Sequence, residues 1–228
     1  MDDKNFDDPS VATDWIQGIE SDRAKVREND LYPLLREWLK QSGAREILDI
    51  GAGQGICSEH IDLGDRNYTG LEASPLLVDR AKTQYPQKNR QFILGNIYEM
   101  PLPSAVYDAT FSVAVWHLLS DTQKASSEMS RVLKGSGHFL IVTANPGAYE
   151  LWTALYTETT QTGIQLDGKV IREGKIISND TLYLHTLESI QNSLNDAGLR
   201  VESVEPFRLH PSGQHQFVCI RGQKAPAL

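Results

Sequence analysis

Residues 47–55, Ile47-Leu48-Asp49-Ile50-Gly51-Ala52-Gly53-Gln54-Gly55, join a short apolar run to a glycine-rich turn. The apolar half is typical of a buried parallel strand. A glycine-rich turn between a strand and a helix lets the backbone approach a ligand closely. We expect Gly51 and Gly53 to allow that approach and Gly55 to allow tight helix packing. With Asp49 at the end of the strand, the stretch is a candidate cofactor loop.

The spacing of these glycines is G-x-G-x-G, whereas the dinucleotide fingerprint is G-x-G-x-x-G. Ile56 stands where the third glycine of that fingerprint would fall. A second acidic residue, Glu72, ends the next expected strand about 20 residues after the loop, where a carboxylate accepts hydrogen bonds from ribose hydroxyls. Alone, Glu72 is equally well a solvated residue at a strand end. Beside the loop, it favours a cofactor that contains adenosine.

Strands and helices alternate outward from this loop. We expect strands over residues 46–50, 68–71, 91–94, 107–115 and 138–143, and helices from the loop to about residue 63, over 75–85 and over 121–133, the last stopping at Gly135. A helix over 186–197 and two strands over 199–208 and 214–221 follow. The predicted fold is α/β, a doubly wound and mostly parallel seven-stranded sheet with an antiparallel C-terminal hairpin.

The chain of 228 residues fits one large domain, 1–228, better than two. N-terminal helices are expected over 10–42, the second starting near Asp30 and ending at Gly43. Residues 145–185 form an insertion, with a predicted helix over 149–161 and short strands over 170–177 and 181–185. An insertion beyond the carboxyl end of the fifth strand is well placed to form a lid over a substrate.

Composition narrows the classes of partner. The net charge is -8 and no block of Lys and Arg offsets it, which argues against nucleic acid and favours a small-molecule substrate. No apolar stretch is long enough for a membrane span, and the acidic N-terminus does not resemble a signal peptide. Cys57 and Cys219 are far apart and suit a reduced, cytoplasmic setting, and no cluster of ligands predicts a metal site. Monomer and homodimer both stay open.

Four segments together resemble the successive motifs of the class I S-adenosylmethionine (SAM)-dependent methyltransferase family, of the small-molecule type. They are Ile47–Gly55, Tyr68–Ser74, Gly95–Pro103 and Tyr107–Leu119. The stretch Arg131–Gly137 is similar to the family's sequence before the fifth strand. The resemblance covers roughly residues 30–145 and the C-terminal helix and hairpin. It implies SAM as the cofactor and methyl transfer as the activity, and it says nothing of the acceptor.

The resemblance assigns the ribose and methionine parts of SAM to the loop and the second strand. It implies that backbone groups of Gly51, Ala52 and Gly53 line the methionine half. Asp49 would fix the loop and help to hold the amino group, and Glu72 would bind the ribose.

The adenine and the sulfonium are assigned further along the chain. Ala73 would pack beside the adenine, and Asn96 and Ile97 would lie at its edge, although the family more often has Asp where Asn96 stands. The backbone of Ser112 and Val113 would pass near the sulfonium.

Catalysis needs little from the protein, because SAM carries an activated methyl group and the protein mainly aligns the transfer. A general base is needed only when the acceptor is protonated. His117, after the fourth strand, and His185, at the end of the insertion, are the candidates, and a packing role is open for both. Tyr149, Glu150 and Tyr183 are candidate substrate contacts.

The N-terminal helices carry two aromatic residues, Trp15 and Tyr32, that are candidates to cover the cofactor. For Trp15, packing against the sheet is the alternative.

We predict an enzyme that transfers a methyl group from SAM to a small molecule at oxygen, nitrogen or carbon. One alternative is a non-catalytic SAM-binding protein. A second is an NAD-dependent oxidoreductase, against which Ile56 and the hairpin ending both count.

Overall fold

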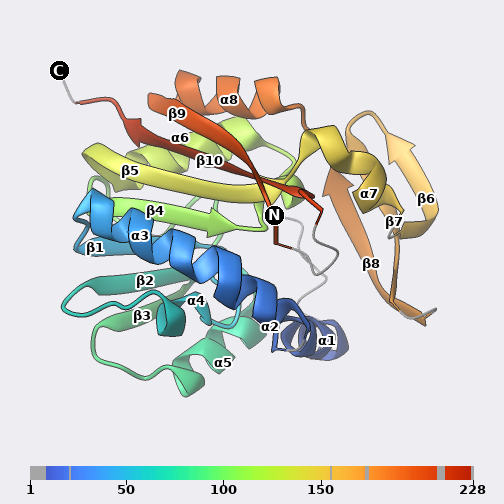
Figure 1. The fold of residues 1–228 in the computed structure, drawn as a ribbon, viewed down its shortest axis with the longest axis horizontal. Coiled ribbons are helices and arrows are strands. Elements are labelled where there is room, and N and C mark those ends of the chain that lie inside the picture. Colours follow the sequence, from blue (N-terminus) through green and yellow to red (C-terminus); the bar gives the residue numbers. More distant parts are fainter. Residues whose placement is uncertain (1–8, 21, 155, 173–174, 210–213, 227–228) are drawn as a thin grey trace.

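The computed structural model describes residues 9–20, 22–154, 156–172, 175–209 and 214–226. Seven strands form one sheet in the order β3-β2-β1-β4-β5-β10-β9 (Figure 1). The mutually parallel strands are β1 (Glu46–Ile50), β2 (Asn67–Glu72), β3 (Arg90–Leu94), β4 (Tyr107–Val113) and β5 (Leu133–Ala144). β10 (Phe217–Lys224) runs antiparallel to β5 and to β9 (Leu199–Phe207). The predicted sheet with its antiparallel hairpin is confirmed.

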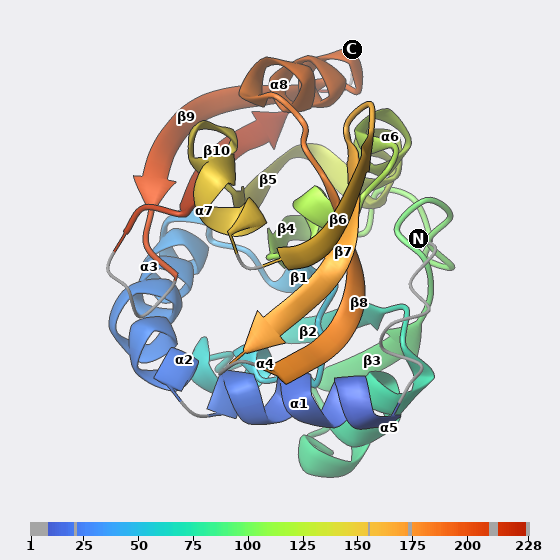
Figure 2. The same ribbon diagram turned by 90° about the vertical axis from the view of Figure 1, so that its right-hand side faces the viewer.

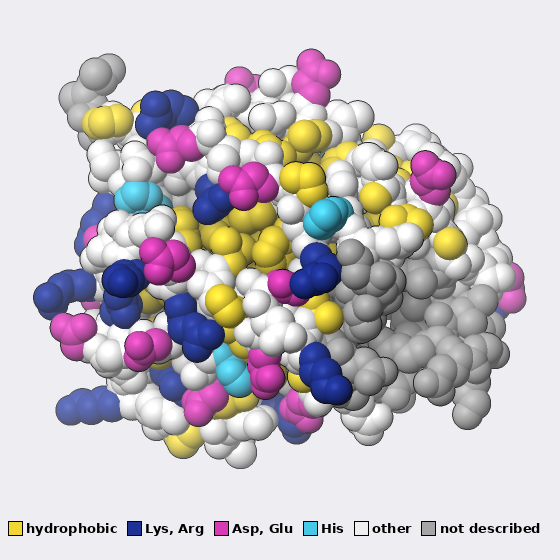
Figure 3. Space-filling view, in the orientation of Figure 1, with side chains coloured by type: hydrophobic (Ala, Val, Ile, Leu, Met, Phe, Trp, Pro, Cys, Tyr) yellow, Lys and Arg dark blue, Asp and Glu magenta, His cyan; other side chains and the backbone are white. Residues whose placement is uncertain are grey.

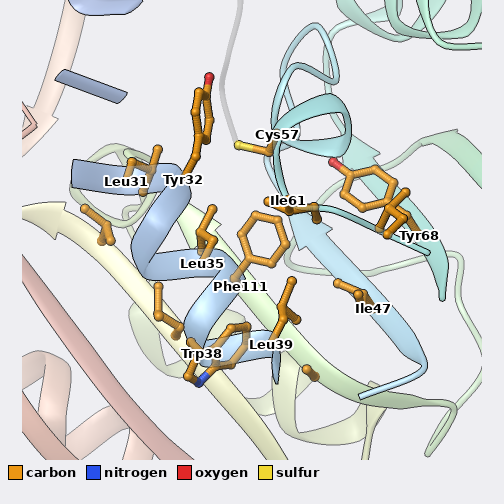
Figure 4. Close-up of a cluster of buried hydrophobic side chains, with 14 of the residues drawn as sticks. Leu31, Tyr32, Leu35, Trp38, Leu39, Ile47, Cys57, Ile61, Tyr68 and Phe111 are labelled. Atoms are coloured by element: carbon orange, nitrogen blue, oxygen red, sulfur yellow. The ribbon is translucent and has the colours of Figure 1, made fainter. Parts of the chain in front are cut away.

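Helices cover both faces of this sheet. One buried cluster joins it to α3 (Tyr32–Ser42), α4 (Cys57–His60) and α5 (Pro75–Gln84) (Figure 4). The other joins it to α6 (Thr122–Val132) and α8 (Leu187–Asp196). In β1, Ile47 belongs to the first cluster and Leu48 to the second, since successive side chains of a strand point to opposite faces. This explains why β1 is almost continuously apolar.

The N-terminal segment contains α1 (Pro9–Glu20), α2 (Asp22–Val26) and a single π-helical turn, η1 (Arg27–Leu31), which leads into α3. α3 ends at Gly43, as predicted, because that residue takes the left-handed conformation at φ 63°. The side chain of Trp15 lies outside the described residues, and so does the turn expected at 211–213.

Two predicted helix ends are wrong. The helix after the glycine loop does not reach residue 63, because α4 ends at His60 and Asp62 adopts a left-handed φ of 51°. α6 ends at Val132 and β5 begins directly at Leu133, so no stop occurs at Gly135. The glycine-rich stretch instead forms an irregularity within β5, where the register against β4 shifts.

The predicted helix of the insertion is too long, and its two predicted strands are misplaced. The helix over 149–161 is reduced to α7 (Tyr149–Thr153), after the short turn η3 (Pro146–Ala148). The threonine-rich remainder forms β6 (Tyr156–Thr162), since β-branched side chains fit a pleated strand better than a helix. The observed strands are β7 (Gln165–Arg172) and β8 (Lys175–Tyr183), so the strand predicted over 170–177 covers the end of one and the start of the other, and the strand predicted over 181–185 covers only the end of β8. β6, β7 and β8 form a separate antiparallel sheet.

This small sheet lies beyond the carboxyl ends of the central parallel strands, with α1 crossing below it (Figures 1 and 2). β8 contacts both α1 and η2 (Trp116–Leu118), the 3₁₀ turn that follows β4. The insertion therefore lies at the edge where α/β sheets bind ligands.

Basic and acidic side chains are interspersed on the face of the molecule shown in Figure 3. Among the described residues, no helix combines the length and the hydropathy of a membrane span.

Candidate functional site

The glycine loop is fixed by the neighbouring strand. The backbone N–H groups of Gly51 and Ala52 both donate to the carbonyl of Leu71 in β2, at 2.8 and 3.0 Å. Gly51 has a φ of 76°, and a Cβ at this position would lie 2.3 Å from a methyl group of Val115. The loop thus takes a path that only glycine permits, pressed against the segment that follows β4.

Glu72, the acidic residue predicted to bind the ribose, lies beside the glycine loop. One carboxylate oxygen accepts from the N–H of Gly53 at 2.8 Å, and the other accepts from Ala73 and Ser74 at 2.9 and 3.0 Å. The side chain is 8% exposed. Burial raises the pKa of this carboxyl, and the three backbone hydrogen bonds oppose that shift. The acidic residue and the glycine loop therefore meet at the end of β2.

Asp49 lies beneath the loop and is fully enclosed. Its carboxylate accepts a hydrogen bond of 2.6 Å from the Tyr68 hydroxyl in β2. Burial raises the pKa of Asp49 to about 7, although the Tyr68 hydrogen bond works in the opposite direction. Its anchor is thus the neighbouring strand.

The third glycine has the packing role that the sequence predicts. A Cβ on Gly55 would approach the Phe92 ring to 2.6 Å and Ala81 to 3.0 Å. This close contact brings the start of α4 against α5 and β3.

The residues expected at the adenine follow β2 and β3. Ala73 is partly buried beside Glu72, and Ile97 is 3% exposed. The Asn96 side-chain oxygen accepts the N–H of Tyr98 at 2.8 Å and so closes its own turn. A carbonyl oxygen has two lone pairs, so one remains for a ligand.

The end of β4 lies next to the loop. The Ser112 hydroxyl donates to the carbonyl of Ile50 at 2.9 Å, which ties β4 to the last residue of β1. Two residues later Ala114 takes a left-handed φ of 62°, and its N–H donates to Val142 at 2.7 Å. This turn places Val115 on Gly51.

His117 is buried and has a defined tautomer. The N–H of Ala144 donates to its Nδ1 at 3.3 Å, and the Thr143 hydroxyl is 3.1 Å from the same atom. Because a backbone amide can only donate, the ring proton is on Nε2. Burial, with a smaller contribution from His185, lowers the pKa of His117 to about 3, so the ring is neutral.

His185 has the same tautomer for a different reason. Its Nε2 lies 2.6 Å from the carbonyl of Leu119, which can only accept, so Nε2 carries the proton and Nδ1 is an acceptor. Burial lowers the pKa of His185, and the Leu119 carbonyl opposes that shift. His117 lies in η2, which contacts β8, the strand that leads to His185.

Of the candidate substrate contacts in the insertion, Tyr149 and Tyr183 contact other residues and Glu150 is exposed. The Tyr149 hydroxyl donates to the carbonyl of His185 at 2.8 Å and so ties α7 to the end of β8. The ring of Tyr183 lies 6.2 Å from that of His185. Trp152 packs 5.2 Å from the His117 ring, and Glu150 is exposed.

Sequence reasoning missed Arg27. This arginine is only 6% exposed, and its guanidinium donates to the Tyr32 hydroxyl. Its Nε has no hydrogen-bond partner among the described residues, and its charge acts on Asp49 and Cys57. The available signal was its spacing of four from Leu31, which places both on one helical face.

Tyr32, expected to cover the cofactor, is buried at 2% exposure. Its ring stacks on His60 of α4, with a centroid distance of 4.2 Å and an interplanar angle of 3°. Tyr32 thereby joins the N-terminal segment to the helix that follows the glycine loop.

Comparisons with known proteins point to the same family. A family model described as a methyltransferase domain matches residues 48–141. A probable S-adenosylmethionine-dependent methyltransferase of Mycolicibacterium smegmatis is 33% identical over 137 residues, 60% of this chain and 52% of that protein. A malonyl-[acyl-carrier protein] O-methyltransferase of Serratia marcescens is 29% identical over 129 residues, 57% of this chain and 50% of that protein. The chain spans about half the length of these curated relatives.

A solved S-adenosylmethionine-dependent methyltransferase of Clostridium acetobutylicum shares the fold. It aligns with a TM-score of 0.69 at 13% identity, over 91% of this chain and 96% of that one. The matched stretch 48–141 contains the glycine loop, Glu72 and the end of β4, which the structure brings together. The chain is thus similar to SAM-dependent methyltransferases, in sequence over residues 48–141 and in fold over most of its length.

Proposed function

We propose that the chain transfers the methyl group of SAM to a small-molecule acceptor at oxygen, nitrogen or carbon. The observation that carries the proposal is the meeting of Glu72 with Gly53 at the end of β2. A buried carboxylate there offers oxygens to the ribose hydroxyls, while the loop offers backbone groups to the methionine part.

The residues present fit the cofactor along its whole length. Gly53 carries no side chain that would hinder a close approach, while Val115 fills the space that a side chain at residue 51 would take. Asp49 would hold the amino group, and Ala73, Asn96 and Ile97 would enclose the adenine. The backbone of Ser112 and Val113 would pass the sulfonium, next to the loop to which Ser112 is bonded.

The activated methyl group comes with the cofactor, so the work of the protein is alignment and exclusion of water. The insertion 145–185 supports this role as a lid that carries Tyr149, Tyr183 and His185 to the carboxyl edge of the sheet. Tyr149 anchors the end of the lid through the His185 carbonyl. Tyr183 and the exposed Glu150 remain candidate acceptor contacts.

For an acceptor that must lose a proton, His185 is better suited than His117. The Nδ1 of His117 already accepts from Ala144, and its pKa of about 3 makes protonation costly. The Nδ1 of His185 is unprotonated, and the Leu119 carbonyl on its other nitrogen would stabilise the imidazolium. His185 is therefore the proposed base, with His117 as a neutral neighbour.

Incubation with methyl-labelled SAM and a cell extract separated by mass tests the proposal. Label in the low-mass fraction, absent with the Glu72→Ala variant, supports a small-molecule acceptor. Label only on carrier-bound acyl groups or other macromolecules contradicts that acceptor class. A protein that binds SAM and transfers no label is the non-catalytic alternative. The match of residues 48–141 to a methyltransferase domain favours methyl transfer over the oxidoreductase alternative.

A further inference from the structure

The buried ring of His117 keeps one N–H without an acceptor. The residue is 7% exposed, and its Nδ1 accepts from the Ala144 N–H at 3.3 Å. The Thr143 hydroxyl oxygen accepts the backbone N–H of His117 at 3.1 Å and lies 3.1 Å from the same Nδ1, so its own proton is free to point at that nitrogen. These contacts fix the ring and leave its proton on Nε2. No described residue accepts from this Nε2–H.

His185 leaves the complementary group unpaired. The residue is 6% exposed, and its Nε2–H donates to the Leu119 carbonyl at 2.6 Å, so Nδ1 is an acceptor. Among the described residues, no group donates to this Nδ1. Neither this atom nor the Nε2 of His117 is one of the enclosed polar atoms without a partner, so both open onto accessible space. Buried polar groups are normally hydrogen-bonded, so this donor and this acceptor are available to a ligand.

The two rings lie at the same edge of the fold. His117 is in η2, and His185 bonds to Leu119, the residue that follows η2. Figure 2 looks onto this edge, where α7 and β8 lie in front of the ends of β4 and β5. Val115, two residues before His117, fills the space above Gly51 of the loop. The pair of histidines therefore lies between the glycine loop and the insertion.

The ring contacts of this pair are aromatic. The centroid of Trp152 in α7 is 5.2 Å from that of His117 and 4.9 Å from that of Phe217, the first residue of β10. The Tyr183 ring is 6.2 Å from the His185 ring, at an interplanar angle of 28°. None of these neighbours is charged. Such surroundings favour a planar, apolar acceptor over a charged one.

We propose that His117 is a substrate-binding residue, whose Nε2–H donates to an acidic hydroxyl of the methyl acceptor while Nδ1 of His185 takes the proton of that hydroxyl. This inference rests on the proposed function, because it concerns the acceptor side of the same site. One hydroxyl donates one hydrogen bond and accepts another, so it matches the pair. The acceptor is then a planar phenol or enol, and the methylated atom is oxygen.

The acidity of the hydroxyl follows from the base. Burial lowers the pKa of His185, so its ring is too weak a base for an ordinary alcohol, whereas a phenol has a pKa of about 10. Proton transfer leaves an imidazolium and an oxyanion. The oxyanion forms the new O–CH3 bond as the S–CH3 bond breaks and S-adenosylhomocysteine leaves. A neutral imidazole N–H, as on His117, stabilises a developing negative charge on oxygen.

Methyl transfer from labelled SAM to three probes tests the acceptor class on the wild-type protein. The probes are 4-nitrophenol, 4-nitrobenzyl alcohol and 4-nitroaniline, each at millimolar concentration. Label should pass to the phenol about 10-fold or more faster than to the alcohol or the amine. Similar rates for the three would overturn the proposal, and so would a phenol that takes no label while a cell extract does. If the extract takes no label either, the proposed function fails as well, which distinguishes the two failures.

Two substitutions of His117 separate a substrate-binding role from a packing role. His117→Asn keeps an acceptor near Nδ1 and loses the Nε2–H, whereas His117→Gln keeps a donor near Nε2 and loses the contact with Ala144. The asparagine variant should lower kcat/KM for 4-nitrophenol about 10- to 150-fold, and the glutamine variant should lower it less. S-adenosylhomocysteine affinity should be unchanged in both. A packing role predicts the opposite order, and that order would overturn the proposal.

Two further measurements complete the test. His138→Asn, at a partly buried histidine of β5 that bonds to Gln223, is the control and should leave kcat/KM unchanged. A double-mutant cycle of His117→Asn with His185→Gln tests whether both rings bind one hydroxyl. The combined loss should be smaller than the product of the separate losses, because both substitutions act on the same group. Losses that multiply would assign the rings to different groups and reject the shared hydroxyl.

Discussion

The carboxylate of Glu72 accepts a hydrogen bond of 2.8 Å from the backbone N–H of Gly53. Gly53 lies in the turn that follows β1, and Glu72 is the last residue of the neighbouring strand β2. Their contact fixes the Glu72 carboxylate beside the glycine loop, so the acceptor expected for the ribose and the loop expected for the methionine part lie at one point of the fold.

Replacement of Glu72 by Ala should weaken SAM binding by about 1.5 to 3 kcal/mol, since hydrogen bonds to a charged group are lost. The affinity of Glu72→Gln for SAM should lie between those of the wild type and Glu72→Ala, because glutamine keeps the shape of the side chain and loses its charge. Calorimetric titration measures the effect, with Glu188→Ala on the exposed side of α8 as the control. Unchanged affinity in Glu72→Ala would remove this residue from the site.

Gly51→Ala should lower the free energy of unfolding by about 2 to 5 kcal/mol, combining left-handed strain with overpacking against Val115. Gly64→Ala is the matched control, because Gly64 also has a positive φ, of 55°, but nothing lies within 4 Å of its added Cβ. Strain alone predicts a loss of about 1 to 2 kcal/mol there. Urea unfolding measures both variants, and equal losses would show that the contact with Val115 does not matter.

His117 should make the protein less stable in acid. Its folded pKa, about 3, lies below the unfolded value of 6.5, so the unfolded state binds more protons between these pH values. Stability from this group is therefore full above pH 6.5 and is lost as the pH falls, by at most about 1.4 kcal/mol per pH unit. The variant His117→Asn keeps an acceptor for Ala144 and removes the titration.

The difference in unfolding free energy between the wild type and His117→Asn, measured as a function of pH, separates the effect of His117 from those of other groups whose pKa is shifted. Asp49 has the opposite sign, because its pKa is raised to about 7 and its contribution is lost as the pH rises toward 7. A difference that stays flat from pH 4 to 7 would show that His117 is not neutral in the folded protein.

His185→Gln should reduce kcat by about 10²- to 10⁴-fold for an acceptor that loses a proton, the usual contribution of a general base. The glutamine amide keeps a donor for the Leu119 carbonyl and removes Nδ1. S-adenosylhomocysteine affinity should stay the same, and the loss of wild-type activity in acid should disappear from the pH profile of the variant. A pH profile identical to wild type would exclude His185 as the base.

The parts of the fold predicted from the sequence are those with local signals. β1, the glycine loop and Glu72 depend on strand periodicity and on backbone shapes that glycine allows, and Gly43 and Gly198 mark helix ends with positive φ. The insertion was harder, because residues 154–161 carry no apolar stripe of either period. Their threonines favoured the strand β6 once β7 was available as a partner.

The sequence predicted the glycine loop and Glu72, which the structure brings together, and it missed Arg27, whose burial depends on the tertiary structure. Arg27 shares one helical face with Leu31, but that spacing alone does not show that the side chain is buried.

The contact of β8 with η2, which contains His117, joins segments far apart in sequence, as does the Tyr149 bond to the end of β8. The tautomers of His117 and His185 depend on backbone groups of Ala144 and Leu119, which only the folded chain supplies.

A crystal structure of the complex with S-adenosylhomocysteine tests the central claim most directly. It should show both ribose hydroxyls at about 2.7–3.2 Å from the Glu72 carboxylate, with the homocysteine part along Gly51–Gly53. Adenosine density elsewhere on the molecule, or a ribose out of reach of Glu72, would contradict the account.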